Sequence, residues 1–444
     1  MIAAGVRAGS SPVDAVRVAL DRIAVLDGDL GAFATVRRSQ ALIEAALLAG
    51  RDDLGRLPLA GVPVAVKDTV PVAGVAPWRD PSAPAEADHP LVLRLRAAGA
   101  VVVGTTTASD ASLWPTTDGR APDGRVVVTR NPWNRSGTAG GSSGGAGAAV
   151  AAGLVPVAQG TDSLGSVRIP AAACGLVGIK PTPGVVMPVG VGRTDWSGLA
   201  VHGSLATTVE DAALLLSVLA GRPDLAAVGE PPPGLRVAVA VRPPLPGVRT
   251  ALPVVRAVFE LAAALRRAGF SVERAEPSYP RSAALAAVAR WTNAATEDLD
   301  EVPALRRADP QRRTLRHAAL GRRLHRWIRP SDVLEWQAAA ERFMTGRDLL
   351  IMPVTASPGL PALDWSRRSW SSNVLASLRW TGGFAGAWNL AGWPAISVPA
   401  GFDPLTRTPI GVQLVARPGE EPLLVAVAAL LERLRPWRRM AWTT

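Results

Sequence analysis

The chain has 444 residues, of which 48% are hydrophobic and 19% are charged, and its formal net charge is +11. This length allows a large buried core. No apolar run reaches the roughly 20 residues that a membrane-spanning helix needs; the best candidate, 146–158, is too short and contains glycine and proline. The sequence therefore predicts no membrane insertion.

The first half of the chain alternates between helical and strand patterns. Helical periodicity begins at Ser11 and Pro12, which suit the N-cap and the first helical position. A short apolar strand ends at Lys67. The elements that we expect in this half are a helical region over 11–49, strands over 61–66 and 100–104, a helix over 89–98, a polar loop over 105–130, a small-residue helix over 146–153, and strands over 154–160 and 176–179.

The second half continues the same alternation. It predicts helices over 208–220, 253–268 and 422–433, a helical region over 283–347, and strands over 235–241, 270–274, 348–353, 389–401 and 410–416. We find no internal repeat, so we expect a single large α/β domain over 1–444, with a central mixed, mostly parallel twisted sheet flanked by helices on both faces. Its expected parts are N-terminal helices (1–60), a core (61–221), a variable helical region (222–347) and a C-terminal part of the same sheet (348–444).

The single cysteine and the N-terminal pattern bear on location. Cys174 alone excludes an internal disulfide framework and fits a reducing compartment. Residues 1–24 mix arginine and aspartate into the apolar positions, which is typical of an amphipathic helix and not of a secretion signal. We therefore expect a cytoplasmic protein.

Arginine supplies almost all of the positive charge. Of 48 cationic residues, only Lys67 and Lys180 are lysines. The arginine-rich segment 306–329 could bind nucleic acid, but no zinc-finger spacing, basic zipper or aromatic RNA motif accompanies it. We interpret it as a solvated helical surface and expect no nucleic-acid partner. Lysine loses its proton readily when buried, whereas arginine does not. A lysine at position 67 in such an arginine-rich chain therefore favours a site that needs an amine able to be neutral.

Two turns rich in glycine and serine lie close together, GGSSGG at 140–145 and GTDSLGS at 160–166. Glycine at this density is typical of backbone that approaches another group closely. A serine there can be a nucleophile, a phosphate ligand or a plain turn residue. No lysine follows the glycines as in a phosphate loop, no Gly-x-Ser-x-Gly elbow occurs, and the four histidines show no zinc-binding pattern.

A serine nucleophile would need a base. Lys67 is suited to that role, because burial at the end of an apolar strand would favour the neutral amine, which can accept a proton. The alternative is a surface ion pair between Lys67 and Asp68, and spacing alone favours that alternative.

Several of these segments together resemble the amidase signature family. GGSSGG, GTDSLGSVRIPAA (160–172) and CGLVGIKPT (174–182) are similar to its defining signature. The similarity extends to GVPVAVKD (61–68), TRNPWN (129–134), NLAGWPAISVPAG and GVQLVARPGEE, and so covers most of the chain. It implies an amidase that converts a carboxamide into a carboxylate and ammonia or an amine.

The resemblance also implies roles for individual residues. Ser166 would be the nucleophile that forms an acyl-enzyme. Ser142, preceded by a cis peptide bond, would relay a proton between Ser166 and the base Lys67. The oxyanion hole would consist of backbone N–H groups, from Ser163, Leu164, Gly165 and Ser166. The resemblance implies no cofactor and no metal, and a small-molecule amide as substrate; a homodimer is an open alternative.

The nucleophile turn departs from the family pattern at Leu164, where glycine is usual. A leucine fits if its φ is negative, but its side chain would reshape the pocket. We interpret Asp162 and Arg168 as supports of this turn. Candidates for substrate contact are Gly141 and Trp114, and candidates for an apolar pocket wall are Trp114, Trp291, Trp370, Trp380 and Trp388.

Two other functions stay open. The first is the glutaminase subunit of a glutamine-dependent amidotransferase, which the sequence of the loop 108–128 disfavours. The second is a diverged, non-catalytic member of the family. The identity of the substrate cannot be read from the sequence.

Overall fold

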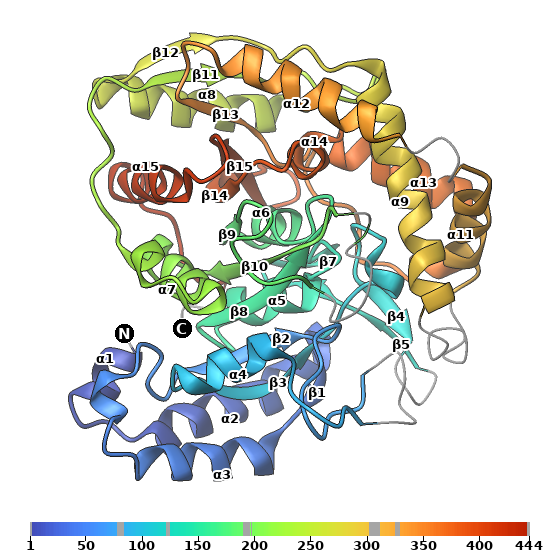
Figure 1. Cartoon of the computed structure of the whole chain (residues 1–444). Helices are drawn as coiled ribbons and strands as arrows, with labels where there is room; N and C mark the ends of the chain where they lie inside the picture. The colour runs from blue at the N-terminus through green and yellow to red at the C-terminus, as the bar shows by residue number, and fades with distance from the viewer. Residues whose placement is uncertain are drawn as a thin grey trace.

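Figure 1 shows a computed structural model of the chain. The structure describes residues 2–77, 84–120, 125–189, 196, 198–301, 311–324 and 329–441. Its large sheet is built from β1 (Phe33–Val36), β2 (Pro63–Lys67), β3 (Val101–Thr106), β8 (Val157–Asp162), β9 (Val177–Lys180), β10 (Val201–Ala206), β11 (Arg236–Val239), β12 (Ser271–Arg274), β13 (Leu349–Pro353), β14 (Ala395–Phe402) and β15 (Pro409–Val415). Two small hairpins pair β4 (Asp118–Arg120) with β5 (Val126–Val128) and β6 (Arg130–Asn131) with β7 (Asn134–Thr138).

The helices flank this sheet on both sides (Figure 1). They are α1 (Ile2–Arg7), α2 (Pro12–Leu30), α3 (Arg38–Ala49), α4 (Pro90–Ala97), α5 (Gly144–Ala151), α6 (Arg168–Cys174), α7 (Val209–Ala220), α8 (Leu252–Arg267), α9 (Arg281–Glu301), α11 (Arg312–Leu324), α12 (Pro330–Met344), α13 (Trp370–Thr381), α14 (Phe384–Ala391) and α15 (Glu421–Leu434). The predicted single α/β domain with a mixed sheet is confirmed. None of the helices that the described residues form is long and apolar enough to cross a membrane.

The direction of the strands corrects one expectation. The sheet order is β1-β3-β2-β8-β10-β9-β14-β15-β13-β11-β12. Among the described strands, four neighbouring pairs are parallel and six are antiparallel. The prediction of a mostly parallel sheet was therefore wrong. One reason is β10, which the sequence did not predict and which enters antiparallel between β8 and β9; another is the antiparallel pairing of β14 with β15.

Three local predictions also need comment. Ser11 caps α2 through its side chain and Pro12 follows as predicted. However, α2 ends at Leu30, where Gly31 caps it with a left-handed φ of 62°, and β1 interrupts the expected helical region. The expected strand over 389–401 begins only at Ala395, because Asn389 and the two residues after it complete α14. The helical region 283–347 consists of α9, α11 and α12.

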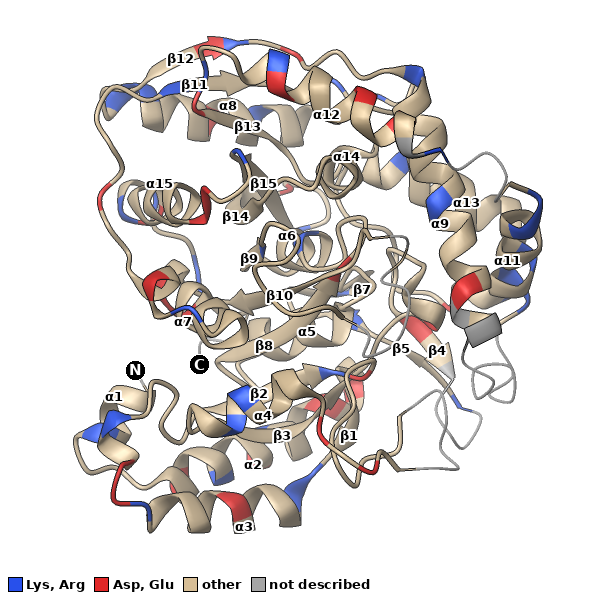
Figure 2. Ribbon diagram, viewed as in Figure 1, with Lys and Arg blue, Asp and Glu red and all other residues tan. Residues whose placement is uncertain are grey.

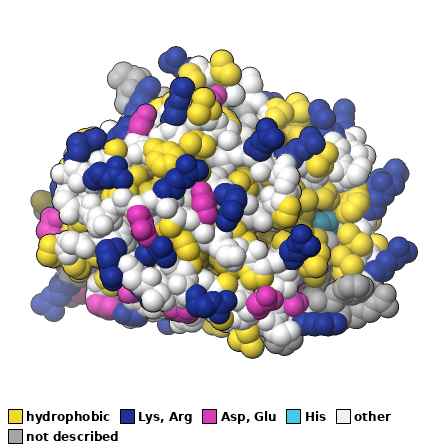
Figure 3. Space-filling model, turned by 90° about the horizontal axis from the view of Figure 1, so that it is seen from above, with side chains coloured by type: hydrophobic (Ala, Val, Ile, Leu, Met, Phe, Trp, Pro, Cys, Tyr) yellow, Lys and Arg dark blue, Asp and Glu magenta, His cyan; other side chains and the backbone are white. Residues whose placement is uncertain are grey.

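Charged residues are spread over many elements (Figure 2). On the face in Figure 3, arginines lie scattered among hydrophobic and uncharged side chains. Part of the arginine-rich segment lies outside the described residues; its described part includes α11, which is amphipathic. The helix buries Arg313 and His317 and exposes Arg312, Arg316 and Arg322. That part is a solvated helical surface.

Candidate active site

Lys67 ends β2 inside the sheet, where β2 runs parallel to β3 and β8. Its side chain is fully buried. The Nζ atom lies 2.7 Å from Ser142 Oγ and 2.6 Å from Thr161 Oγ1, and the backbone N–H donates to Gln159 Oε1 at 3.0 Å. Burial disfavours a charged ammonium group. The alternative of a surface ion pair at this position is therefore wrong.

The first serine turn brings Ser142 to this lysine. The peptide bond between Gly141 and Ser142 is cis, as the resemblance implied. Position 141 has no room for a side chain, because a Cβ atom there would lie 2.6 Å from the carbonyl oxygen of Trp114. Ser143 joins the two turns, since its N–H donates to the Ser166 carbonyl oxygen at 3.2 Å and its hydroxyl donates to the Thr161 carbonyl oxygen at 3.2 Å.

The second turn is built around the Asp162 carboxylate. This carboxylate accepts the N–H groups of Gly165, Val167 and Arg168 at 2.8, 3.2 and 3.3 Å. The Arg168 guanidinium donates to both of its oxygens at 3.0 Å, and both side chains are fully buried. Burial alone would raise the pKa of Asp162, but the adjacent guanidinium holds this pKa well below its usual range. Asp162 and Arg168 therefore support the turn, as expected.

Two polar residues from the C-terminal part complete this support, and the sequence analysis missed them. Asn389 of α14 donates through Nδ2 to Asp162 Oδ1 at 2.8 Å and to its carbonyl oxygen at 3.0 Å. Gln413 of β15 accepts a hydrogen bond from Arg168 Nη1 at 2.8 Å. Both residues are single polar residues inside apolar runs of the sequence. Because a buried polar group requires a hydrogen-bond partner, this pattern could have identified them.

The predicted oxyanion donors differ in their availability. The N–H of Gly165 is engaged by Asp162, as described above. Within the described part of the chain, the N–H groups of Ser163, Leu164 and Ser166 donate no hydrogen bond. Leu164 is not among the described non-glycine residues with positive φ, whereas Gly165 has a φ of 117°. The condition for accommodating a leucine at 164 is therefore met.

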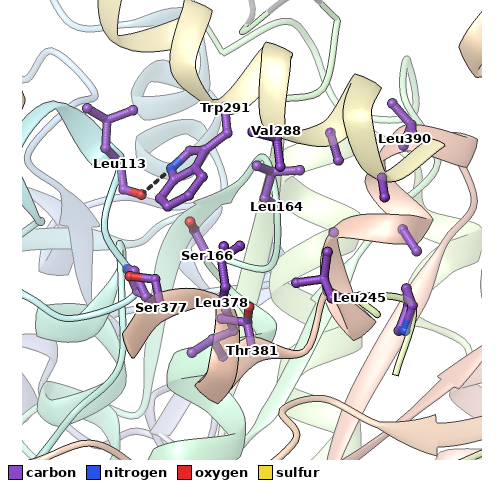
Figure 4. Close-up of a pocket in the computed structure, with 18 of the residues that line it drawn as sticks. Leu113, Leu164, Ser166, Leu245, Val288, Trp291, Ser377, Leu378, Thr381 and Leu390 are labelled. Atoms are coloured by element: carbon purple, nitrogen blue, oxygen red, sulfur yellow. Dashed lines mark hydrogen bonds between the residues drawn. The ribbon is translucent and has the colours of Figure 1, made fainter. Parts of the chain in front are cut away.

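Ser166 is half-buried and lines a cavity of about 110 Å³. Its hydroxyl makes no hydrogen bond to the described residues; in free enzymes such contacts often tighten only when substrate binds. In Figure 4, Ser166 lies between Trp291 of α9 and Leu378 of α13. Gly141 and Trp114, the candidates for substrate contact, also line this cavity.

The tryptophan prediction is correct in part. Trp114 and Trp291 line the cavity, together with Trp196 and Trp336, which the sequence analysis did not select. The three others have indole N–H groups that are engaged elsewhere: Trp370 donates to His317, Trp380 to the Ser357 carbonyl oxygen and Trp388 to Met352 Sδ. These three do not belong to the cavity wall.

Comparison with known proteins identifies the family. The amidase family model matches residues 14–425. The chain is 37% identical to a putative amidase, AmiB2, of Mycobacterium bovis over 441 residues, which is 95% of this chain and 92% of that protein. It is 33% identical to an acylamidase of Rhodococcus erythropolis over 464 residues, 96% of this chain and 93% of that one.

A solved structure gives the same answer. The chain superposes on 6-aminohexanoate cyclic dimer hydrolase, solved with its substrate, with a TM-score of 0.86 and 30% identity, covering 98% of this chain and 96% of that one. The two serine turns, the buried lysine and the similarity to these relatives all indicate the same family. The chain belongs to the amidase signature family and is a hydrolase of carbon–nitrogen bonds.

Proposed function

We propose that this protein hydrolyses a carboxamide through an acyl-enzyme on Ser166, with Ser142 and Lys67 as its proton relay. The observation that carries the proposal is the buried contact of 2.7 Å between Lys67 Nζ and Ser142 Oγ, next to a cavity that Ser166 and Gly141 line. A neutral amine there can accept a proton from a hydroxyl, and a relayed hydroxyl gives the nucleophile its base.

In the first half of the reaction, Ser166 Oγ bonds to the carbonyl carbon of the amide. Its proton moves to Ser142, and the Ser142 proton moves to Lys67. The carbonyl oxygen becomes an oxyanion, which the N–H groups of Leu164, Ser163 and Ser166 are free to stabilise. The Gly165 N–H is not among these donors, because it already donates to Asp162. Each such donor typically contributes about 2.7–4 kcal/mol to transition-state stabilisation.

Collapse of the oxyanion breaks the carbon–nitrogen bond. The proton held by Lys67 returns through Ser142 to the leaving nitrogen, which departs as ammonia or an amine. A water molecule then adds to the ester on Ser166 and gives a proton to the same relay. Breaking the ester bond releases the carboxylic acid and returns a proton to Ser166 Oγ, so no cofactor takes part in the balance.

The test is turnover of a panel of primary and aryl amides by the wild-type chain and by Ser166→Ala. We expect the substitution to abolish turnover while the circular dichroism spectrum stays unchanged. Activity retained in Ser166→Ala would refute the assignment of the nucleophile. Ammonia release from glutamine that depends on a co-purifying partner would favour the glutaminase alternative, and a wild-type chain that hydrolyses no amide and binds no serine-directed probe would favour a non-catalytic member.

Two further predictions depend on the sequence alone. We also propose a cytoplasmic location, because a chain with one cysteine fits a reducing compartment. A homodimer is an open alternative, and sedimentation of the purified chain measures it.

A further inference from the structure

The cavity beside Ser166 has an uncharged lining. None of the described residues that form it is aspartate, glutamate, lysine or arginine. Apart from backbone atoms and indole nitrogens, its polar atoms are hydroxyls, contributed by Ser112, Ser166, Tyr279, Ser377 and Thr381. The remaining surface is carbon from alanine, leucine, valine, isoleucine, proline and tryptophan.

One wall of the cavity is a fixed aromatic cluster. The rings of Trp114 and Trp291 meet edge to face, with centroids 5.8 Å apart at 77°, and His317 packs against both. The Trp114 N–H donates to Thr314 Oγ1 at 3.1 Å, and the Trp291 N–H donates to the Leu113 carbonyl oxygen at 2.8 Å (Figure 4). Both indoles are therefore held in place and have no free donor to offer a ligand.

Two basic side chains pack against this wall, Arg313 and His317. Arg313 stacks on Trp114 at 4.8 Å from the ring centroid, but it does not line the cavity. It donates to Asp118 Oδ2 at 2.7 Å, and both side chains are buried. Burial lowers the pKa of His317 to about 3, so its ring is neutral at physiological pH. No unpaired positive charge among these groups would attract an anionic substrate.

From this lining we infer that the cavity binds an uncharged, apolar group of the amide, best a flat aromatic ring, and rejects substrates that carry a carboxylate or an ammonium group there. The inference rests on the proposed function of Ser166. A charge that enters such a cavity loses its hydration and gains no partner, whereas a ring gains contact with the two indoles. Free glutamine carries both kinds of charge and is disfavoured.

Leu164 limits the space in this cavity beside Ser166. Its side chain belongs to the lining, and its Cδ2 atom lies 3.3 Å from the position of a Cβ atom on Gly386 in α14. The leucine stands inside the nucleophile turn, where the family usually has glycine, so it directly limits the space beside Ser166. Leu164 is therefore a specificity-determining residue, while its backbone N–H remains available for the oxyanion.

The first experiment compares kcat/KM for three amides of the same shape: para-toluamide, para-carboxybenzamide and para-aminomethylbenzamide. We expect both charged amides to be at least about 30-fold poorer substrates than the neutral one, because an unpaired charge must enter the cavity. A smaller ratio for either charged amide would overturn the inference. Acetamide and para-methylacetanilide complete the set. Faster hydrolysis of para-toluamide or of para-methylacetanilide than of acetamide supports the inference. Hydrolysis of both that is no faster than that of acetamide overturns it.

The second experiment tests Leu164. In Leu164→Ala, kcat/KM for a naphthamide should rise relative to para-toluamide by about tenfold, and Gly386→Ala should lower the same ratio. The matched control is Leu405→Ala, because Leu405 is 90% exposed and lies outside the cavity lining. A ratio that Leu164→Ala leaves unchanged would overturn the role of this side chain.

Ser166→Ala separates the two proposals. If this variant hydrolyses the amides, the proposed function fails. If Ser166 is required and the charged amides are still good substrates, only the inference about the cavity fails.

Discussion

Replacing Arg168 by methionine tests whether the buried ion pair beneath Ser166 holds the nucleophile turn. The guanidinium donates to both oxygens of the Asp162 carboxylate at 3.0 Å, and neither side chain is exposed. Methionine retains much of the side-chain volume and removes the charge. The Asp162 carboxylate would then stay buried without its cation.

The expected loss can be estimated from these contacts. Removing one partner of a buried ion pair lowers the free energy of unfolding by about 3–5 kcal/mol. Asn389 and Gln413 also lose their hydrogen bonds to the guanidinium, which adds about 1 kcal/mol each. The three backbone N–H groups on Asp162 remain and offset part of this loss. We expect a net loss of about 4 kcal/mol at neutral pH.

Urea unfolding of the wild type and Arg168→Met measures this loss. The deficit should shrink as the pH falls from about 7 to about 5, because without Arg168 burial raises the pKa of Asp162 and the carboxyl can bind a proton. In the wild type the ion pair holds this pKa below its usual range, so Asp162 stays ionised over the same interval.

The control is Arg256→Met on α8, since Arg256 is exposed and its substitution should change the free energy of unfolding by less than about 0.5 kcal/mol. A loss below about 1 kcal/mol in Arg168→Met, or a deficit that grows on acidification, would refute the reasoning.

Two other substitutions probe buried polar groups. Tyr279→Phe removes a buried hydroxyl that has no hydrogen-bond partner among the described residues. We therefore expect the free energy of unfolding to stay unchanged or to rise by up to about 1 kcal/mol. A clear loss of this free energy in urea unfolding would instead show that the hydroxyl forms a hydrogen bond in solution. Burial and the nearby charge of Arg168 lower the pKa of Lys180 to about 7. Between this value and the unfolded pKa near 10.4 the unfolded chain binds more protons, so Lys180 should make stability rise with pH, by at most about 1.4 kcal/mol per unit. Lys180→Met should remove that rise, and an equal pH dependence in both proteins would contradict the lowered pKa.

The sequence predicted that Lys67 and Ser142 lie together, but it did not predict the strand directions of the sheet. Lys67 was recognisable because the chain otherwise uses arginine and because the surrounding motif resembles a known family; its spacing alone favoured a surface position. Asn389 reaches Asp162 and Gln413 reaches Arg168, each across more than two hundred residues of chain, and a single sequence does not reveal contacts at that separation. Strand β10 was missed because strand propensity depends on the neighbouring strands, and its antiparallel entry changed the character of the sheet.

The oxyanion turn shows the same limit on a smaller scale. The resemblance implied four consecutive N–H groups as donors, but only the hydrogen-bond geometry reveals that the Gly165 N–H donates to the Asp162 carboxylate. Such an assignment depends on which way each peptide plane faces, and the residue types in a glycine-rich turn leave this open.

We propose that Lys67 activates Ser166 as a nucleophile through Ser142. Covalent labelling with a fluorophosphonate probe, followed by peptide mass spectrometry, tests it most directly. We predict an adduct on Ser166 in the wild type, no adduct in Ser166→Ala, and labelling at least about 100-fold slower in a folded Lys67→Met variant. An adduct on a different residue, or labelling of Lys67→Met at the wild-type rate, would refute this activation of Ser166 by Lys67.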